Sequence, residues 1–230
     1  MGATRIDADQ AVAHLRAADP VMARVIAAVG PFAMRIGDGD PFRALARAIV
    51  AQQISGAAAA SILARLTAQL LGPGAVASPV RRTDPGWDGA TLPFPPPERI
   101  LAASDEELAA AGLSRQKIAA LRDLALHFTE GELAAACFDE WDDEEVIERL
   151  TRVRGIGRWT AEMFLMFHLG RPDVLPVDDL GIRRAVRRQY GLDALPSPAQ
   201  LREIAAPWRP WATVACWYLW RSEAVLPPGG

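Results

Sequence analysis

Residues 149–190, RLTRVRGIGRWTAEMFLMFHLGRPDVLPVDDLGIRRAVRRQY, decide the fold of this chain. They read as a helix, a glycine hairpin, a second helix, a short loop and a third helix. The hairpin is Val153-Arg154-Gly155-Ile156-Gly157. Its glycines allow backbone angles closed to other residues and let another group come very close. Together with the amides of the next helix's first turn, the hairpin predicts an anion site suited to a phosphate.

Two carboxylates stand at the start of the third expected helix. Asp178 and Asp179 directly follow Pro176-Val177. The partial positive charge of a helix N-terminus would keep such a carboxylate ionised. One interpretation is that Asp178 caps the helix that starts at Leu180. The other is that Asp178 does chemistry beside a bound phosphate, and the two interpretations are compatible.

Four motifs along the chain resemble the helix-hairpin-helix superfamily of base-excision DNA glycosylases, which share a Gly/Pro-rich loop and an essential Asp. They stand in the family's order, and the resemblance covers most of the chain. They are residues 48–55 (AIVAQQIS), 112–117 (GLSRQK), the hairpin and its carboxylate at 153–178, and 208–221 (WRPWATVACWYLWR). The last motif is similar to the C-terminal helix of the alkylpurine branch, the 3-methyladenine DNA glycosylase II type.

The resemblance implies an all-α fold of two helical lobes with the active-site cleft between them. Lobe one would comprise about residues 1–40 and 190–230, and lobe two about residues 41–189, with the hairpin at 153–157. The residues agree with this fold class, since the chain shows no internal repeat and no convincing alternation typical of a strand.

Local signals place several helix boundaries. The apolar pattern of residues 9–29 is interrupted at Asp19-Pro20, which predicts two short helices. Residues that favour the start of a helix predict four further helix starts, at Asp40, Ser55, Ser104 and Ser114. Residues 72–97 are rich in glycine and proline and predict a loop.

The function implied by the resemblance is that of a monofunctional DNA glycosylase in base-excision repair. It would flip an alkylated purine of the 3-methyladenine or 7-methylguanine type out of duplex DNA and hydrolyse its N-glycosidic bond. Two alternatives stay open, a non-catalytic DNA-binding or damage-sensing module and a same-fold glycosylase for deaminated bases. The residues before Pro41 are too few for the extra N-terminal domain of the larger alkylpurine enzymes, so base preference also stays open.

Asp178 is the expected catalytic residue, because it matches the essential Asp that follows a Pro and one variable residue in the family. Cleavage of the bond between base and sugar develops positive charge on the sugar, which an ionised carboxylate stabilises. Asp179 is the second candidate. Family members that also cut the strand carry a lysine where this chain has Trp159, and the only lysine is Lys117. We therefore expect base excision without strand cleavage.

The base pocket implied by the resemblance includes Trp159 and Trp220. An alkylated purine carries positive charge, which the face of an indole attracts. Met163, one turn beyond Trp159, would face either this pocket or the core. The alternative for any of these tryptophans is ordinary core packing, which we expect for Trp208, Trp211 and Trp217.

The expected contacts with DNA lie in two turns. Gln53 corresponds to the family's wedge position, which fills the hole left by the flipped nucleotide. Alternatively, Gln52 and Gln53 only satisfy backbone groups at a helix end. The other expected DNA-binding residues surround the hairpin and are Arg154, Gly155, Gly157, Arg158 and Thr160. Arg154 replaces the family's usual proline, which reduces hairpin rigidity and adds a charge for DNA.

No cofactor is expected to be required. Hairpins of this family often hold an alkali cation, Na⁺ or K⁺, and the matching backbone carbonyls are those of Thr151, Val153 and Gly155. The two cysteines, Cys137 and Cys216, are too few for the four-cysteine iron–sulfur cluster of some relatives and suit a reducing compartment.

Charge is unevenly distributed, although the net charge is only −3. Residues 149–188 hold nine arginines and four acidic residues, a balance of +5, whereas residues 98–148 hold fourteen acidic and four basic residues, a balance of −10. This predicts a field that steers phosphate toward one side. The alternative for any single arginine is a solvated helix face.

Composition argues against a membrane protein. Half of the residues are apolar, yet no run approaches the roughly 18 apolar residues that span a bilayer. The N-terminal residues lack the apolar core of a signal peptide. We expect a monomer that acts on damaged double-stranded DNA in the cytoplasm, associated with the nucleoid and without a membrane partner.

Overall fold

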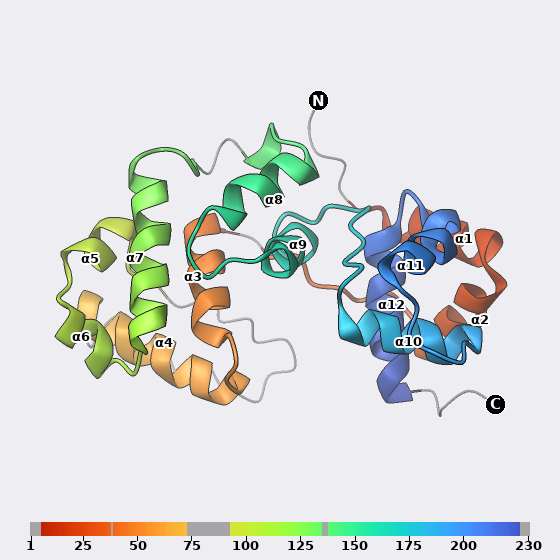
Figure 1. Ribbon diagram of the computed structural model, residues 1–230, viewed down its shortest axis with the longest axis horizontal. Helices are drawn as coiled ribbons and strands as arrows, with labels where there is room; N and C mark the ends of the chain where they lie inside the picture. Colours follow the sequence, from red (N-terminus) through yellow and green to blue (C-terminus); the bar gives the residue numbers. More distant parts are fainter. Residues whose placement is uncertain (1–5, 38, 73–92, 135–137, 226–230) are drawn as a thin grey trace. The chain divides into compact units, whose positions relative to one another are not determined.

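The computed structural model describes residues 6–37, 39–72, 93–134 and 138–225, and every regular element within these ranges is helical (Figure 1). The predicted all-α fold is confirmed. Most of the predicted loop at 72–97, and Cys137, lie outside the described residues. None of the described helices is long and apolar enough to cross a bilayer.

The chain divides into two compact units. We call residues 1–36 and 165–230 the terminal unit, and residues 37–164 the central unit. The terminal unit contains α1 (Ala8–Ala18), α2 (Pro20–Val29), α10 (Leu180–Tyr190), α11 (Pro198–Ala205), the 3₁₀ turn η3 (Ala206–Trp208) and α12 (Ala212–Val225). The central unit contains α3 (Pro41–Ala51), α4 (Gly56–Leu71), α5 (Pro97–Ala102), α6 (Asp105–Ala110), α7 (Arg115–Thr129) and α8 (Asp143–Thr151).

The boundary between the units falls within α9 (Arg158–Phe167). This differs from the lobes expected from the sequence, which put the return to the first lobe at about residue 190. Residues 165–189 belong to the terminal unit because α10 packs against α12 and α2. Its buried residues Ile182, Ala185 and Val186 supply an apolar face.

The predicted helix boundaries are confirmed at their caps. Asp19 separates α1 from α2 and accepts hydrogen bonds from two amides of α2's first turn. Asp40 caps α3 in the same way, and Ser55 and Ser114 cap α4 and α7 by accepting one amide each. Ser104 starts α6 as predicted, and its side chain and that of Glu107 form a complete capping box.

α12 forms the centre of the terminal unit. Every residue from Ala212 to Leu219 is buried, so this helix has no solvated face over its first two turns. A helix that is buried all round needs neighbours on all sides, and α10, α2 and α1 each contact it. Three tryptophans before and within α12 are buried as expected, namely Trp208, Trp211 and Trp217.

A buried hydrogen-bond network joins the two chain segments of the terminal unit. The Asp19 carboxylate accepts hydrogen bonds from Val21 N at 2.8 Å, from the Tyr190 hydroxyl and from Trp208 Nε1 at 2.9 Å. Burial, and then the hydrogen bond to Asp19, raise the pKa of the Tyr190 hydroxyl. Asp19 therefore both starts α2 and ties it to residues far along the chain.

The core of the central unit is built around α7, which packs against α3, α5 and α6. Aromatic rings continue this core, with ring centroids 5.3 Å apart between Phe42 and Phe128 and 5.3 Å apart between Phe138 and Phe164. The apolar face of α7 is buried through Ile118, Leu121 and Leu124. α7 thus links α3, α5 and α6 in this core.

Removal of the Asp19 carboxylate tests its role in the terminal unit. Asp19→Ala should lower the free energy of unfolding by about 3 kcal/mol, since it removes a cap and leaves buried donors unpaired. Asp7→Ala removes the α1 cap at an exposed site and should cost only about 1 kcal/mol. Urea unfolding measures both, and equal losses would contradict the proposed contribution of the buried donors.

Candidate functional site

The glycine hairpin is a tight turn whose apolar residues point inward. Val153 and Ile156 are buried, and Ile156 N donates to Val153 O at 3.1 Å. Gly155 has φ +80°, in the left-handed region that favours glycine. A Cβ atom at Gly155 would lie 3.2 Å from Ala120 Cβ of α7, so the hairpin rests directly on that helix. At Gly157 no atom lies within 4 Å of such a Cβ among the described residues.

α7 also anchors the hairpin through a hydrogen bond. The backbone amide of Arg154 donates to Asp123 Oδ2 at 2.7 Å. The Arg154 side chain is exposed, and within the described ranges no carboxylate forms an ion pair with it. The hairpin therefore presents Arg154 and the exposed Gly155 and Gly157 to solvent while α7 holds its backbone.

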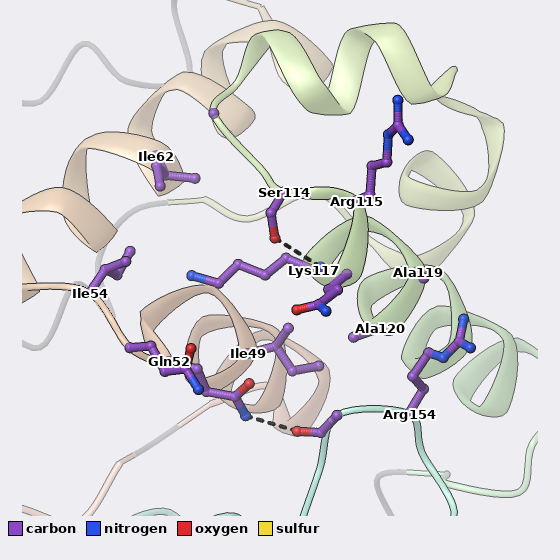
Figure 2. Close-up of a pocket in the computed structure, with 14 residues that line it drawn as sticks. Ile49, Gln52, Ile54, Ile62, Ser114, Arg115, Lys117, Ala119, Ala120 and Arg154 are labelled. Carbon is purple, nitrogen blue, oxygen red and sulfur yellow. Dashed lines mark hydrogen bonds between the residues drawn. The ribbon is translucent and has the colours of Figure 1, made fainter.

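The turn between α3 and α4, residues 52–55, lies beside the hairpin, and we call it the wedge turn. Gln52 Nε2 donates to Gly155 O at 2.9 Å, which joins the two turns directly (Figure 2). Gln52 thus satisfies a backbone carbonyl, as one sequence interpretation held, but the carbonyl belongs to the hairpin. Gln53 is exposed and has φ 59°, the only positive φ outside glycine in the described chain. Ile54 is also exposed, at 37%.

A pocket of about 740 Å³ opens between the wedge turn, the first turn of α7 and the hairpin (Figure 2). Among the described residues, its lining contains three cations and no carboxylate. The cations are Arg115, Lys117 and Arg154. Apolar side chains from α3 and α4 form part of its wall, among them Ile49 and Ile62. Such a lining suits a ligand with anionic and apolar parts, as a nucleotide has.

The arginines on either side of the hairpin are largely paired with α8. Arg149 pairs with Glu145 and Arg152 with Glu148, both at i,i+4 spacing. Arg158 bridges Glu144 and the buried Glu162. Its hydrogen bond lowers the pKa of the Glu144 carboxyl, and Glu144 in turn raises the pKa of Arg158.

The predicted separation of charge is therefore wrong for these arginines. The acidic segment does not lie apart from the basic one, because three of its glutamates on α8 neutralise three arginines near the hairpin. Regional sums of charge could not reveal this pairing. Arg158 reaches a phosphate only in competition with two carboxylates, whereas the Arg154 side chain has no such competition within the described ranges.

The first turn of α9 places an aromatic ring at the surface. The Trp159 side chain is 50% exposed, unlike the three core tryptophans of the terminal unit. Thr160, the next residue, is buried, and Met163 is half-buried one turn later. An exposed aromatic ring of this kind presents a surface on which a flat ligand can stack.

The two carboxylates at the start of α10 have different environments. Asp179 is buried and caps the helix, since its Oδ1 accepts from Ile182 N at 2.7 Å. The same oxygen accepts from Trp220 Nε1 at 3.0 Å. Asp178 is exposed and lies one residue before the cap. The interpretation that Asp178 caps the helix is therefore wrong, because the cap directly precedes the first helical residue, Leu180.

Trp220 lies close against the start of α10 because residue 181 is a glycine, which was not among the residues predicted from the sequence. A Cβ atom on Gly181 would lie 3.1 Å from Trp220 Cδ1, from Trp220 Nε1 and from Asp179 Oδ1. The Trp220 ring also lies 5.7 Å, centroid to centroid, from Phe167. Its indole N–H is used by Asp179, so any contact of Trp220 with a ligand would be made by the ring.

The expected site residues are shared between the two units. Asp178 and Trp220 belong to the terminal unit. The remaining expected residues belong to the central unit, and they are Gln53, Thr151, Val153, Arg154, Gly155, Gly157, Arg158, Trp159, Thr160 and Met163. The contacts of Gln52 and Lys117 were not predicted from the sequence. Two features of the sequence could have drawn attention to these residues. Gln52 stands next to the expected wedge residue, and Lys117 is the only lysine.

The carbonyls expected to hold an alkali cation lie at the hairpin. Val153 O accepts from Ile156 N, and Gly155 O accepts from Gln52 Nε2, so each retains one lone pair. Neutral carbonyl oxygens suit hard cations, and the donor chemistry fits an alkali ion. Within the described residues no group of three or more histidine, cysteine or acidic side chains could hold a metal ion.

Comparison with known proteins gives matches over most of the chain. Residues 46–210 match the family model described as HhH-GPD superfamily base excision DNA repair protein. DNA-3-methyladenine glycosylase 1 of Schizosaccharomyces pombe is 34% identical over 218 residues, which cover 92% of this chain and 86% of that protein. DNA-3-methyladenine glycosylase 2 of Escherichia coli is 34% identical over 190 residues, 82% of this chain and 60% of that protein.

Solved structures agree with these matches. The 3-methyladenine DNA glycosylase of S. pombe in complex with abasic DNA superposes with a TM-score of 0.75 at 31% identity, covering 94% of this chain and 98% of that one. A DNA-3-methyladenine glycosidase of Bacillus halodurans superposes with a TM-score of 0.78 at 34% identity, covering 96% and 92% of the two chains.

The two hairpin glycines should respond differently to alanine. Gly155→Ala should lower the free energy of unfolding by at least about 2 kcal/mol, because the side chain meets both a left-handed φ and Ala120. Gly157→Ala meets open space and should cost less than about 1 kcal/mol. Thermal or urea unfolding distinguishes them, and equal costs would mean that the Ala120 contact does not constrain the hairpin.

Proposed function

Because the chain belongs to the HhH-GPD superfamily of base excision DNA repair proteins, we propose that it is a DNA glycosylase that removes alkylated purines from duplex DNA. The substrate class follows the relatives, which are named for 3-methyladenine. The observation that carries the proposal is the different environment of the two carboxylates at the start of α10. Asp179 caps the helix, which leaves the exposed Asp178 carboxylate for chemistry.

The hairpin is the proposed phosphate clamp. The exposed glycines let a phosphate approach the backbone amides that precede α9, where the helix dipole favours an anion. Arg154 adds a charge without a competing carboxylate in the described ranges. Arg158 and Thr160 are further expected contacts, with the Arg158 contact weakened by its two glutamates. Such contacts hold any duplex, whatever its sequence.

The damaged nucleotide must leave the stack before its bond to the sugar is accessible. Gln53, at the strained tip of the wedge turn, is the residue proposed to fill the vacated space. The exposed Trp159 ring is proposed to stack on the flipped base, with Trp220 and Met163 as further pocket residues. The face of an indole attracts a cationic alkylpurine electrostatically, so the pocket would bind such a base more tightly than a neutral one.

The reaction is a hydrolysis. As the N-glycosidic bond breaks, positive charge develops on the sugar and the electron pair of the bond leaves with the base. The Asp178 carboxylate stabilises that charge and orients a water, whose oxygen bonds to C1′ while its proton passes to solvent. The products are free base and an abasic sugar in an intact strand. Water and a carboxylate suffice, so no cofactor is required.

A bound Na⁺ or K⁺ would add positive charge at the hairpin. The carbonyls of Thr151, Val153 and Gly155 would hold it, and its charge would favour the neighbouring phosphate without taking part in bond cleavage. We further propose that the protein acts as a monomer in the cytoplasm, at the nucleoid where its duplex substrate lies.

Asparagine substitutions separate the two carboxylates. Asp178→Asn should slow release of 7-methylguanine at least about a hundredfold, because it removes a charge that acts mainly in the transition state. Asp179→Asn keeps an oxygen for Ile182 N and Trp220 Nε1 and should slow release less than about tenfold. Single-turnover base release measures both, and near-wild-type rates for the Asp178 variant would overturn the assignment.

Borohydride trapping tests whether the enzyme also cuts the strand. A lyase forms a Schiff base that borohydride reduces to a stable protein–DNA adduct. Here Trp159 occupies the lyase lysine position, and Lys117 Nζ donates to Val50 O within the central unit. We expect no adduct and an abasic strand that breaks only in alkali. A strong adduct that persists in Lys117→Ala would place the terminal amine in the site and contradict hydrolysis alone.

A further inference from the structure

We propose that Lys117 is a positioning residue that, together with Gln52, holds Gln53 in the conformation needed to enter the duplex. This inference rests on the proposed function, since it takes Gln53 as the wedge. Lys117 is the only lysine of the chain, and its amine has no part in the hydrolysis proposed above. Its contacts give it a different task.

Lys117 holds the end of α3. Its side chain extends from the first turn of α7 toward the wedge turn (Figure 2), and Nζ donates to Val50 O at 2.6 Å. Val50 is one of the last residues of α3, whose carbonyls lack partners inside the helix. Ile54 N, which would continue the helical pattern to Val50 O, bonds to Ala51 O instead. The ammonium therefore replaces a backbone donor where α3 gives way to the turn.

Gln52 holds the other side of the same turn. Its side-chain amide donates to Gly155 O, so the wedge turn is joined to the phosphate-binding hairpin. Gln53 lies directly after these contacts with φ 59°, a left-handed conformation that non-glycine residues adopt only at a cost. Strained conformations of this kind persist only when their surroundings hold them. Lys117 and Gln52 are the side chains whose hydrogen bonds do so here.

The functional consequence is a fixed relation between two DNA contacts. The hairpin holds a phosphate, and the wedge must enter the stack at a set distance along the strand from that phosphate. Because α7 carries the hairpin at Ala120 and Asp123 and reaches the wedge turn with Lys117, one helix keeps both in register. Among the described residues no carboxylate lines the pocket around Lys117, and its ammonium donates to the Val50 carbonyl.

The test uses the complete protein with variants that keep side-chain length. Lys117→Met and Gln52→Met remove one donor each, and Lys117→Arg retains a donor. Single-turnover excision of 7-methylguanine is measured opposite cytosine and opposite thymine, since a mispaired base costs less to flip. Lys117→Met should lose about tenfold opposite cytosine and much less opposite thymine, and Lys117→Arg should recover part of the loss. Gln52→Met should show the same pair-dependent pattern.

Two further measurements separate positioning from binding. The fluorescence of 2-aminopurine beside the lesion, which rises when the neighbouring base leaves the stack, should rise less in Lys117→Met than in the wild type. Affinity for an undamaged duplex should change less than about twofold in Lys117→Met, whereas Gly157→Ala, which adds a methyl group where the phosphate is proposed to approach, should weaken binding to all duplexes. A general loss of duplex affinity in Lys117→Met would make Lys117 a phosphate contact and overturn the inference.

Gln53→Ala distinguishes failure of this inference from failure of the proposed function. If Gln53→Ala excises from both pairs like the wild type, Gln53 is not the wedge and the proposed function loses that step. A second outcome is that Gln53→Ala shows the pair-dependent loss of excision rate but Lys117→Met does not. Lys117→Met would then either excise like the wild type or lose rate equally on both pairs. In both cases only the positioning role of Lys117 is overturned. Should Lys117→Met fail to fold, Gln52→Met, which also removes a donor, gives the same comparison.

Discussion

The close approach of Gly155 to Ala120 is the constraint on which the central unit's site depends. A side chain at 155 would meet α7 at 3.2 Å and would also require a left-handed backbone, so glycine is needed for two independent reasons. With glycine in place, the hairpin lies flat on α7 and Arg154 N reaches Asp123. Its outer surface then remains free of side chains that would keep a phosphate away from the backbone.

α7 acts as the common support of this site. Its first turn reaches the wedge turn through Lys117, and its middle carries the hairpin. The strain at Gln53 follows from this arrangement, because a turn held on both flanks cannot relax by moving away from either. Function and stability are linked here, since hydrogen bonds that shape the turn also decide where the inserted side chain points.

The two adjacent carboxylates at the start of α10 have different roles. They share a helix start, and only one can cap it. Asp179 takes the cap, and Trp220, packed over Gly181, donates to the same oxygen. Asp178 is left exposed beside the N-terminal end of the helix. The glycosylase chemistry proposed for Asp178 is possible because the neighbouring Asp179 caps the helix in its place.

Local sequence determined the helices, most of their caps and the glycine hairpin, because these depend on contacts within four residues along the chain. Asp19, Ser55 and Ser104 are such cases, and the fold class follows from them. The pairing of Arg158 with Glu144 and the hydrogen bonds of Gln52 and Lys117 were decided by tertiary structure. Gln52 and Gly155 are 103 residues apart, and Lys117 and Val50 are 67 apart. Contacts over such separations form only when packing brings the elements together, so no local pattern contains them.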